Sequence, residues 1–192
     1  MKKLSTLSKP LVMALSMASI SVVTVAVSQA ATTKAPSSEQ QAASQSKIGL
    51  EQALLLANKA VKGDIVSVGY DQEDRTVNGN YEIKIITNNN EQEVKVHANT
   101  GKVTKEEVER LVKEDLAEYK AMKQAKLTLT QAISKANQTL KGTVLEAEFE
   151  TDFGKPVYKV EIGKDNQVYK IVIDSTTGNI IRSQARAADS DD

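Results

Sequence analysis

An internal repeat is the feature that most constrains how this chain can fold. Lys47 and Lys126 begin two copies of one pattern, an offset of 79 residues, in which apolar, Gln and Ala positions recur in the same order. A gap of two residues then reduces the offset to 77, so that the segment around Tyr81 matches the segment around Tyr158. Because self-similarity over both ends of a segment is the signature of a repeated structural unit, we predict two similar units in tandem.

Each copy predicts one helix followed by antiparallel strands. The helix is indicated by apolar residues with helical spacing, which in the second copy are Leu129, Ala132, Ile133, Ala136 and Leu140. Thr128 and Gln131 have the spacing of a capping box at its start. Residues 158–162 alternate between apolar and charged side chains, and in residues 169–173 Tyr169, Ile171 and Ile173 alternate with Lys170 and Val172. Such alternation is typical of strands with one buried face. The predicted fold class is α+β, with two repeated units that each pack one helix on a small antiparallel sheet.

Polar and glycine residues mark the predicted ends and turns of these elements. Gly142 is expected to follow the second helix as its C′ residue, whereas Gly49 begins the first helix as a weaker cap than Thr128. Residues 88–90 and 165–166 are predicted hairpin turns, because Asn and Asp tolerate the left-handed conformation. A last short strand is expected over residues 180–182.

A longer helix is predicted between the two copies, over residues 104–123. Thr104 and Glu107 have capping-box spacing, and Glu106 with Arg110 forms a supportive i, i+4 pair. We therefore divide this part of the chain into a first unit (47–104), a linker helix (105–124) and a second unit (125–185). The helix is interpreted as a spacer packed on the units, with a partner-binding helix as the alternative.

The two ends of the chain are predicted to lie outside the repeated fold. Residues 1–30 combine Lys2, Lys3 and Lys9 with an apolar run and small residues before Ala30, the pattern of a cleaved signal peptide; an uncleaved membrane anchor is the alternative. Cleavage would leave 22 basic and 25 acidic residues, a net charge of −3. Residues 31–46 are rich in Ala, Ser, Thr and Gln, which predicts a disordered spacer. Residues 186–192 are predicted to be a frayed tail.

Composition excludes several classes of protein. The full chain has 25 basic and 25 acidic residues, so it lacks the net positive charge of a general nucleic-acid binder. It has no Cys, which excludes disulfides, thiol nucleophiles and Cys-ligated metals. With one His in the whole chain, His-rich metal sites are excluded as well.

The repeated pattern resembles the PepSY domain, which occurs in peptidase propeptides. The resemblance is carried by the helix start at residues 48–53 and 127–132, the strand at residues 158–162, and the segment V-I-D-S-T-T-G-N-I at residues 172–180. The first copy departs at His97, which stands where the second copy has Asp174; that Asp is expected to cap the turn, so the first turn is expected to be looser. The resemblance implies a helix-on-sheet fold, an exported or envelope location and binding to proteins. Inhibition of a peptidase would be an extension from propeptides, since no H-E-x-x-H motif is present.

Few residues suggest chemistry, and we predict no catalytic, cofactor-binding or metal-binding residues. His97 is interpreted as a polar turn residue. Two carboxylate clusters, Asp71/Glu73/Asp74 and Glu146/Glu148/Glu150/Asp152, use the oxygen ligands that calcium prefers but lack EF-hand spacing, and the second alternates like the solvated face of a strand. Tyr81 and Tyr158 are interpreted as packing residues, and residues 154–156 as a turn.

The function expected from these observations is an exported, non-catalytic protein-binding module that inhibits or regulates an envelope or secreted peptidase. Strand addition at an exposed sheet edge is one expected mode of binding. The alternative is a sensor of small ligands or cations, with a site in a cleft between the units; an enzyme is the least supported class. The expected location is the periplasm, with secretion as the alternative. No cofactor and no nucleic-acid partner are expected.

Overall fold

The computed structural model describes residues 38–74 and 76–186, which belong to one compact unit, Lys34–Asp192. Its helices are α1 (Ser38–Ser44), α2 (Leu50–Ala60), α3 (Lys113–Met122) and α4 (Leu129–Thr139). Its strands are β1 (Asp64–Gln72), β2 (Gly79–Thr87), β3 (Asn90–His97), β4 (Val103–Arg110), β5 (Thr143–Asp152), β6 (Lys155–Lys164), β7 (Gln167–Asp174) and β8 (Ile180–Ala185). The predicted signal segment, most of the predicted spacer and residues 187–192 of the predicted tail lie outside the described residues.

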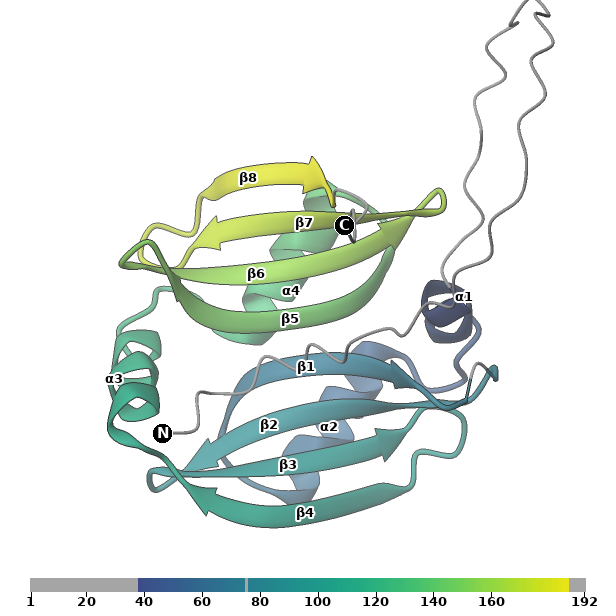
Figure 1. Ribbon diagram of the computed structural model, residues 1–192, viewed down its shortest axis with the longest axis horizontal. Helices are drawn as coiled ribbons and strands as arrows, with labels where there is room; N and C mark the ends of the chain where they lie inside the picture. The colour runs from purple at the N-terminus through teal and green to yellow at the C-terminus, as the bar shows by residue number, and fades with distance from the viewer. Residues whose placement is uncertain (1–37, 75, 187–192) are drawn as a thin grey trace, which may run out of the picture. The chain divides into compact units, whose positions relative to one another are not determined.

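The strands form one antiparallel sheet with the order β4-β3-β2-β1-β5-β6-β7-β8. Each repeat contributes four consecutive strands, and the two sets meet where β1 pairs with β5 (Figure 1). The mixture of helix and antiparallel sheet agrees with the predicted α+β class. The expectation of two separate small sheets is corrected, because the sheet is continuous across the repeats.

The junction between β1 and β5 is short. Three residue pairs join the strands: Ser67 with Glu148, Val68 with Ala147, and Gly69 with Glu146. We call these residues, 67–69 and 146–148, the seam. By comparison, β1 pairs with β2 over almost its whole length. Helix α1 packs against both β1 and β5, so the seam is supported by more than its own backbone hydrogen bonds.

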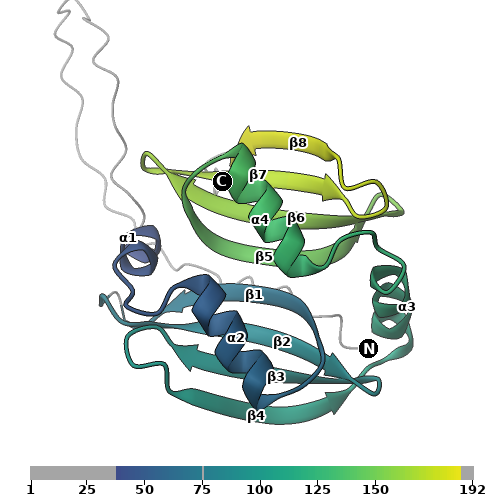
Figure 2. The same ribbon diagram turned by 180° about the vertical axis from the view of Figure 1, so that it is seen from behind.

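Helices α2 and α4 cross the same face of the sheet (Figure 2). Helix α2 packs on β2, β3 and β4, and α4 packs mainly on β5, β6 and β7. Each helix turns small residues toward the strands, and these are fully buried: Ala53, Ala57, Ala132 and Ala136. Alanine at these positions lets the helix backbone approach the sheet closely. The apolar stripe predicted from helical spacing is therefore the stripe that forms the core.

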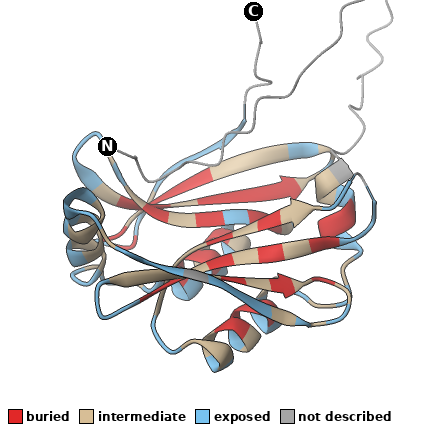
Figure 3. Cartoon of the chain, turned by 60° about the horizontal axis from the view of Figure 1, so that its bottom comes forward, coloured by how far each residue is buried: buried red, intermediate tan, exposed pale blue. Residues whose placement is uncertain are grey.

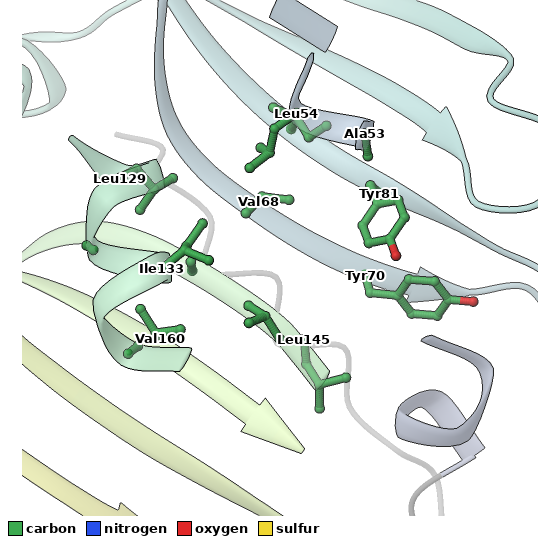
Figure 4. Close-up of a cluster of buried hydrophobic side chains, with 14 of the residues drawn as sticks. Ala53, Leu54, Val68, Tyr70, Tyr81, Leu129, Ile133, Leu145 and Val160 are labelled. Carbon is green, nitrogen blue, oxygen red and sulfur yellow. The ribbon is translucent and has the colours of Figure 1, made fainter. Parts of the chain in front are cut away.

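The core extends without a break beneath both helices. Figure 3 shows buried residues in the strands and in parts of the helices that cross the sheet, with exposed residues in the loops between them. Figure 4 shows Leu54 of α2, Val68 of β1 and Ile133 of α4 in one cluster of buried side chains, which also includes Leu145 and Val160. A continuous apolar core over a continuous sheet means that the repeats share part of their packing.

The predicted helix over residues 104–123 is wrong in its first half, because Val103–Arg110 is strand β4. The Thr104–Glu107 capping box therefore does not exist, and the helix begins at Lys113. The turn at Gly101 (φ +70°) reverses the chain after β3, and pairing with β3 outweighs the weak i, i+4 helix signal. The repeat pointed to this result, since Val103 corresponds to Ile180 at the start of β8.

Two smaller expectations are also corrected. Residues 38–44 of the predicted disordered spacer form α1, in which Ala42 and Ala43 are buried against the strands. Gly142 is not a left-handed C′ residue: Leu140 caps α4, and a Cβ at Gly142 would lie 2.5 Å from the Ile162 side chain and 2.6 Å from the Gly163 carbonyl. Glycine is required there because the strand passes too close for a side chain.

Candidate interaction surface

The face of the sheet opposite α2 and α4 is charged, and most of its charges are compensated. Alternation along the strands directs Glu148 to this face, while its neighbour Ala147 is fully buried on the helix side. Seven ion pairs link basic and acidic side chains of this face: Lys84–Glu91, Lys95–Glu82, Lys95–Glu93, Lys159–Glu150, Lys170–Glu161, Arg182–Asp152 and Arg186–Glu161. Within each repeat this face therefore carries a nearly balanced network.

The seam departs from this balance. Glu146 and Glu148 project from β5 beside Gly69 and Ser67 of β1, which bring no charge to them. None of the ion pairs in the described part of the chain includes Glu146, Glu148 or the nearby Asp71. Within the described residues, the seam therefore gathers carboxylates that form no ion pair with a basic side chain.

The pKa values of these carboxyl groups are raised. Burial, followed by the negative charges of Glu146 and Glu150, raises the pKa of Glu148 to about 7. Burial and the neighbouring Glu161 raise the pKa of Glu146. Burial, together with the negative charges of Asp71, Glu146 and Glu161, also raises the pKa of Glu39 on α1. Desolvation and repulsion both favour the neutral carboxyl, so these acids ionise less readily than ordinary carboxyl groups do.

The two predicted carboxylate clusters are only partly brought together. Asp71 and Glu146 lie close enough for both to influence Glu39, but Glu73 and Asp74 stay exposed in the loop between β1 and β2, where Glu73 accepts a hydrogen bond from Asn80. No group of three His, Asp or Glu in the described ranges is arranged to hold a metal ion. Sequence reasoning missed Glu39, since a low-complexity segment gave no sign of packing on the sheet.

The turns at His97 and Asp174 use different side chains in the same role. Asp174 accepts hydrogen bonds from the backbone N–H groups of Thr176 and Thr177, as expected, and these bonds lower its pKa. His97 accepts one bond, from the backbone N–H of Asn99 to Nδ1 at 3.1 Å. The backbone bonds that close the turns at Gly101 and Gly178 correspond. His97 is thus bound into a turn, which agrees with its interpretation as a polar turn residue.

The predicted packing role of Tyr81 and Tyr158 is confirmed. Both are buried, and each meets an aromatic neighbour edge to face: Tyr70 at 5.4 Å in the first repeat and Phe149 at 5.3 Å in the second. Tyr158 donates a hydrogen bond to the Leu127 carbonyl at 2.6 Å. The repeated pair belongs to the core and leaves no aromatic cage on the surface at these positions.

The two edges of the sheet differ in charge. Strand β4 reads V-T-K-E-E-V-E-R, whereas β8 reads I-I-R-S-Q-A and is almost entirely exposed. Charged residues on an edge strand oppose pairing with other chains, and β4 carries many of them. Edge β8 is therefore the less protected one, although a register shift opposite Val172 and Ile173 of β7 leaves Ile181 as an extra residue near the start of β8.

A shallow pocket of about 360 Å³ lies at the end of α2, over β2, β3 and β4. Its lining includes Lys62 and Lys105 but no carboxylate. It lies within the first repeat, so it differs from the acidic cleft between units that the sensor hypothesis requires. None of the helices in the described ranges is long and apolar enough to cross a bilayer.

Comparison with known proteins identifies the family. No curated protein matches the chain. One similar solved structure is described as that of "a putative lipoprotein" from Clostridium difficile 630; it is 25% identical, covers 77% of this chain and 99% of its own, and has a TM-score of 0.46. The PepSY family, described as the peptidase propeptide and YPEB domain, matches residues 47–107 and 126–184, together more than half of the chain. The chain therefore belongs to the PepSY family and carries two copies of its domain in tandem.

Proposed function

We propose that this protein is an exported, non-catalytic module that binds and regulates an envelope or secreted peptidase. The observation that carries the proposal is the presence of two copies of a domain linked to peptidase propeptides and regulation. The signal-peptide pattern in residues 1–30 supports export. We favour the periplasm as the location, with secretion as the alternative.

Strand addition at β8 is the mode of binding that we propose. A partner segment would pair in extended form with the outer edge of β8, gaining backbone hydrogen bonds that require no particular side chains. The Arg186 N–H donates to the Val168 carbonyl of β7 at 2.7 Å. In an antiparallel ladder every second N–H group of a strand points toward its neighbour, as that of Arg186 does toward β7. The N–H groups of Ser183 and Ala185 therefore point away from β7 and are available to a partner.

The first experiment identifies a peptidase and measures its inhibition. Residues 31–192, shown to be folded, serve as bait for a crosslinked envelope extract, and each captured peptidase is purified and titrated with the protein. We expect a dose-dependent loss of peptidase activity. Capture of no peptidase, or unchanged activity of every captured peptidase at saturating protein, would contradict the proposal.

Matched proline variants test the binding edge. Ser183→Pro removes an outward donor from β8 while leaving the inward bonds to β7 in place. Lys105→Pro is the control, because by the same alternation it removes an outward donor from β4. We expect the first variant to weaken inhibition and the second to leave it unchanged. Equal inhibition by both variants would remove β8 as the binding edge while leaving a regulatory role intact.

A further inference from the structure

The seam combines a short strand pairing with carboxylates that form no ion pairs in the described part of the chain. It is the only strand pairing between the repeats in the described residues, and it consists of three residue pairs. Two of these pairs bring the uncompensated Glu146 and Glu148 to the open face. The acids thus lie at the point where the continuous sheet has the fewest hydrogen bonds to hold it together.

Each element around the seam contributes charges that Glu146 and Glu148 experience. From β5 comes Glu150, from β6 Glu161 and Lys159, from β7 Lys170, and from the end of β8 Arg186. The three basic residues are already within 4 Å of Glu150 or Glu161. Helix α1 adds another carboxyl group, Glu39, which faces Asp71, Glu146 and Glu161. The nearby positive charges are therefore shared with other acids, and ionisation adds repulsion around the seam.

We propose that the seam is a pH-responsive junction between the two repeats, which tightens when Glu146 and Glu148 are protonated and loosens when they ionise. The junction couples α1 to the same change, because Glu39 lies close enough to Glu146 to be influenced by its charge. An exported protein meets the pH of its surroundings, so the coupling of the repeats would follow that pH. This inference does not depend on the identity of a peptidase partner.

The direction of the effect follows from the raised pKa values. A carboxyl group whose pKa is higher in the folded protein than in the unfolded chain stabilises the closed seam. This stabilisation is complete at pH values below the unfolded pKa. For Glu148 that stabilisation is lost as the pH rises from about 4.5, its ordinary value, through about 7. If opening of the seam restores solvation, the opening equilibrium should favour the open seam at pH 8 by roughly tenfold or more relative to pH 5.

Amide hydrogen exchange of residues 31–192 at pH 5 and pH 8 tests the proposal. After correction for intrinsic exchange rates, we expect protection of residues 67–69 and 146–148 to fall about tenfold or more between the two pH values. Protection in β2 and β3, away from the seam, serves as the internal reference and should change much less. Equal change in all strands, or no change at the seam, would overturn the proposal.

The variant Glu146→Gln/Glu148→Gln tests whether these two acids are the cause. Glutamine keeps the shape of the side chain and cannot ionise, so we expect the seam of this variant to be protected at pH 8 nearly as well as at pH 5. Glu91→Gln is the matched control, a strand carboxylate of the same face that is paired with Lys84; it should keep the wild-type pH response at the seam. If the double variant also keeps that response, other groups control the junction and the proposal is wrong. Urea unfolding at both pH values checks that each variant is folded.

Discussion

The two repeats have the same order of helix and strands, but they differ in the side chains at the start of the helix and at one buried aromatic position. The first repeat starts α2 at Gly49, which has no side-chain cap, whereas the second starts α4 at Thr128 with a complete capping box. The first buries the Tyr70 hydroxyl with no hydrogen-bond partner among the described residues, where the second has Phe149. The shared apolar pattern therefore specifies the fold, while local polar groups adjust the stability of each repeat.

The largest expected effect comes from matched truncations in the two cores. Ile85 and Ile162 occupy corresponding positions, and both are fully buried. Changing either to Ala should lower the free energy of unfolding by about 2–5 kcal/mol, because it removes apolar contacts and leaves a cavity. In urea unfolding at pH 5, each variant should shift one shared transition if the sheet couples the repeats. Two separate transitions, each sensitive to only one variant, would show that the repeats unfold independently.

The aromatic pairs offer two substitutions with opposite expected signs. Tyr70→Phe should raise the free energy of unfolding by about 1 kcal/mol, because the native Tyr70 hydroxyl is buried and no residue in the described ranges forms a hydrogen bond with it. Tyr158→Phe should lower it by about 1 kcal/mol, because it leaves the Leu127 carbonyl without its donor. Thermal and urea unfolding measure both. A loss of stability in Tyr70→Phe would mean that this hydroxyl is satisfied in solution.

The two helix caps should also respond differently to substitution, by about 1 kcal/mol or less. Thr128→Ala removes the capping box of α4 and should cost about 1 kcal/mol. Gly49→Thr should recover a few tenths of a kcal/mol, roughly the difference between Gly and Thr as caps, because Gln52 already stands at the N3 position and a Cβ at Gly49 meets no atom within 4 Å. The free energy of unfolding of each single variant is the measurement. If Gly49→Thr lowers it, Gly49 and Thr128 are not equivalent N-cap positions.

Another small effect concerns the start of β1, where Asp64 corresponds to Thr143 of the second repeat. Burial raises the pKa of Asp64, but hydrogen bonds from Tyr119 and Lys123 of the α3 region outweigh it, so the pKa is lowered overall. This stabilisation is present above the ordinary pKa and is lost as the pH falls through the lowered value. Burial and the same bond raise the pKa of Tyr119 to about 12, so its contribution is lost in alkali.

Tyr119→Phe should therefore cost about 0.5 kcal/mol at neutral pH and raise the pKa of Asp64, which NMR titration can follow. Tyr169→Phe is the control, since the Tyr169 hydroxyl bonds Gln167 in its own hairpin. An unchanged Asp64 titration in Tyr119→Phe would show that α3 does not hold the start of β1 through this bond.

Local patterns were enough to predict much of the fold. Helical spacing located α2 and α4, and Asn or Asp pairs located the hairpins, where Asn88, Asn89, Asp165 and Asn166 all adopt positive φ. The capping box at Thr128 was predicted because its residues and spacing are local. Each of these signals depends on residues only a few positions apart, so it can be read without knowing which distant segments come into contact.

The features that sequence analysis missed depend on distant contacts. Strand β4 was predicted as helix because its own residues carry helix signals, while its pairing with β3 depends on the whole hairpin. Helix α1 has a low-complexity sequence and is defined by packing on β1 and β5. The acids of the second cluster were predicted to lie on a solvated strand face, but the absence of compensating charge at the seam depends on which strands become neighbours.

The most direct test of the account is whether the repeats form one sheet in solution. The measurement is the set of backbone NOEs between residues 67–69 and 146–148 in residues 31–192 at pH 5, where the seam should be closed. We predict cross-strand NOEs that match the antiparallel pairing of Val68 with Ala147. Their absence, with the NOEs inside each repeat intact, would contradict the continuous sheet and the pH-responsive junction built on it.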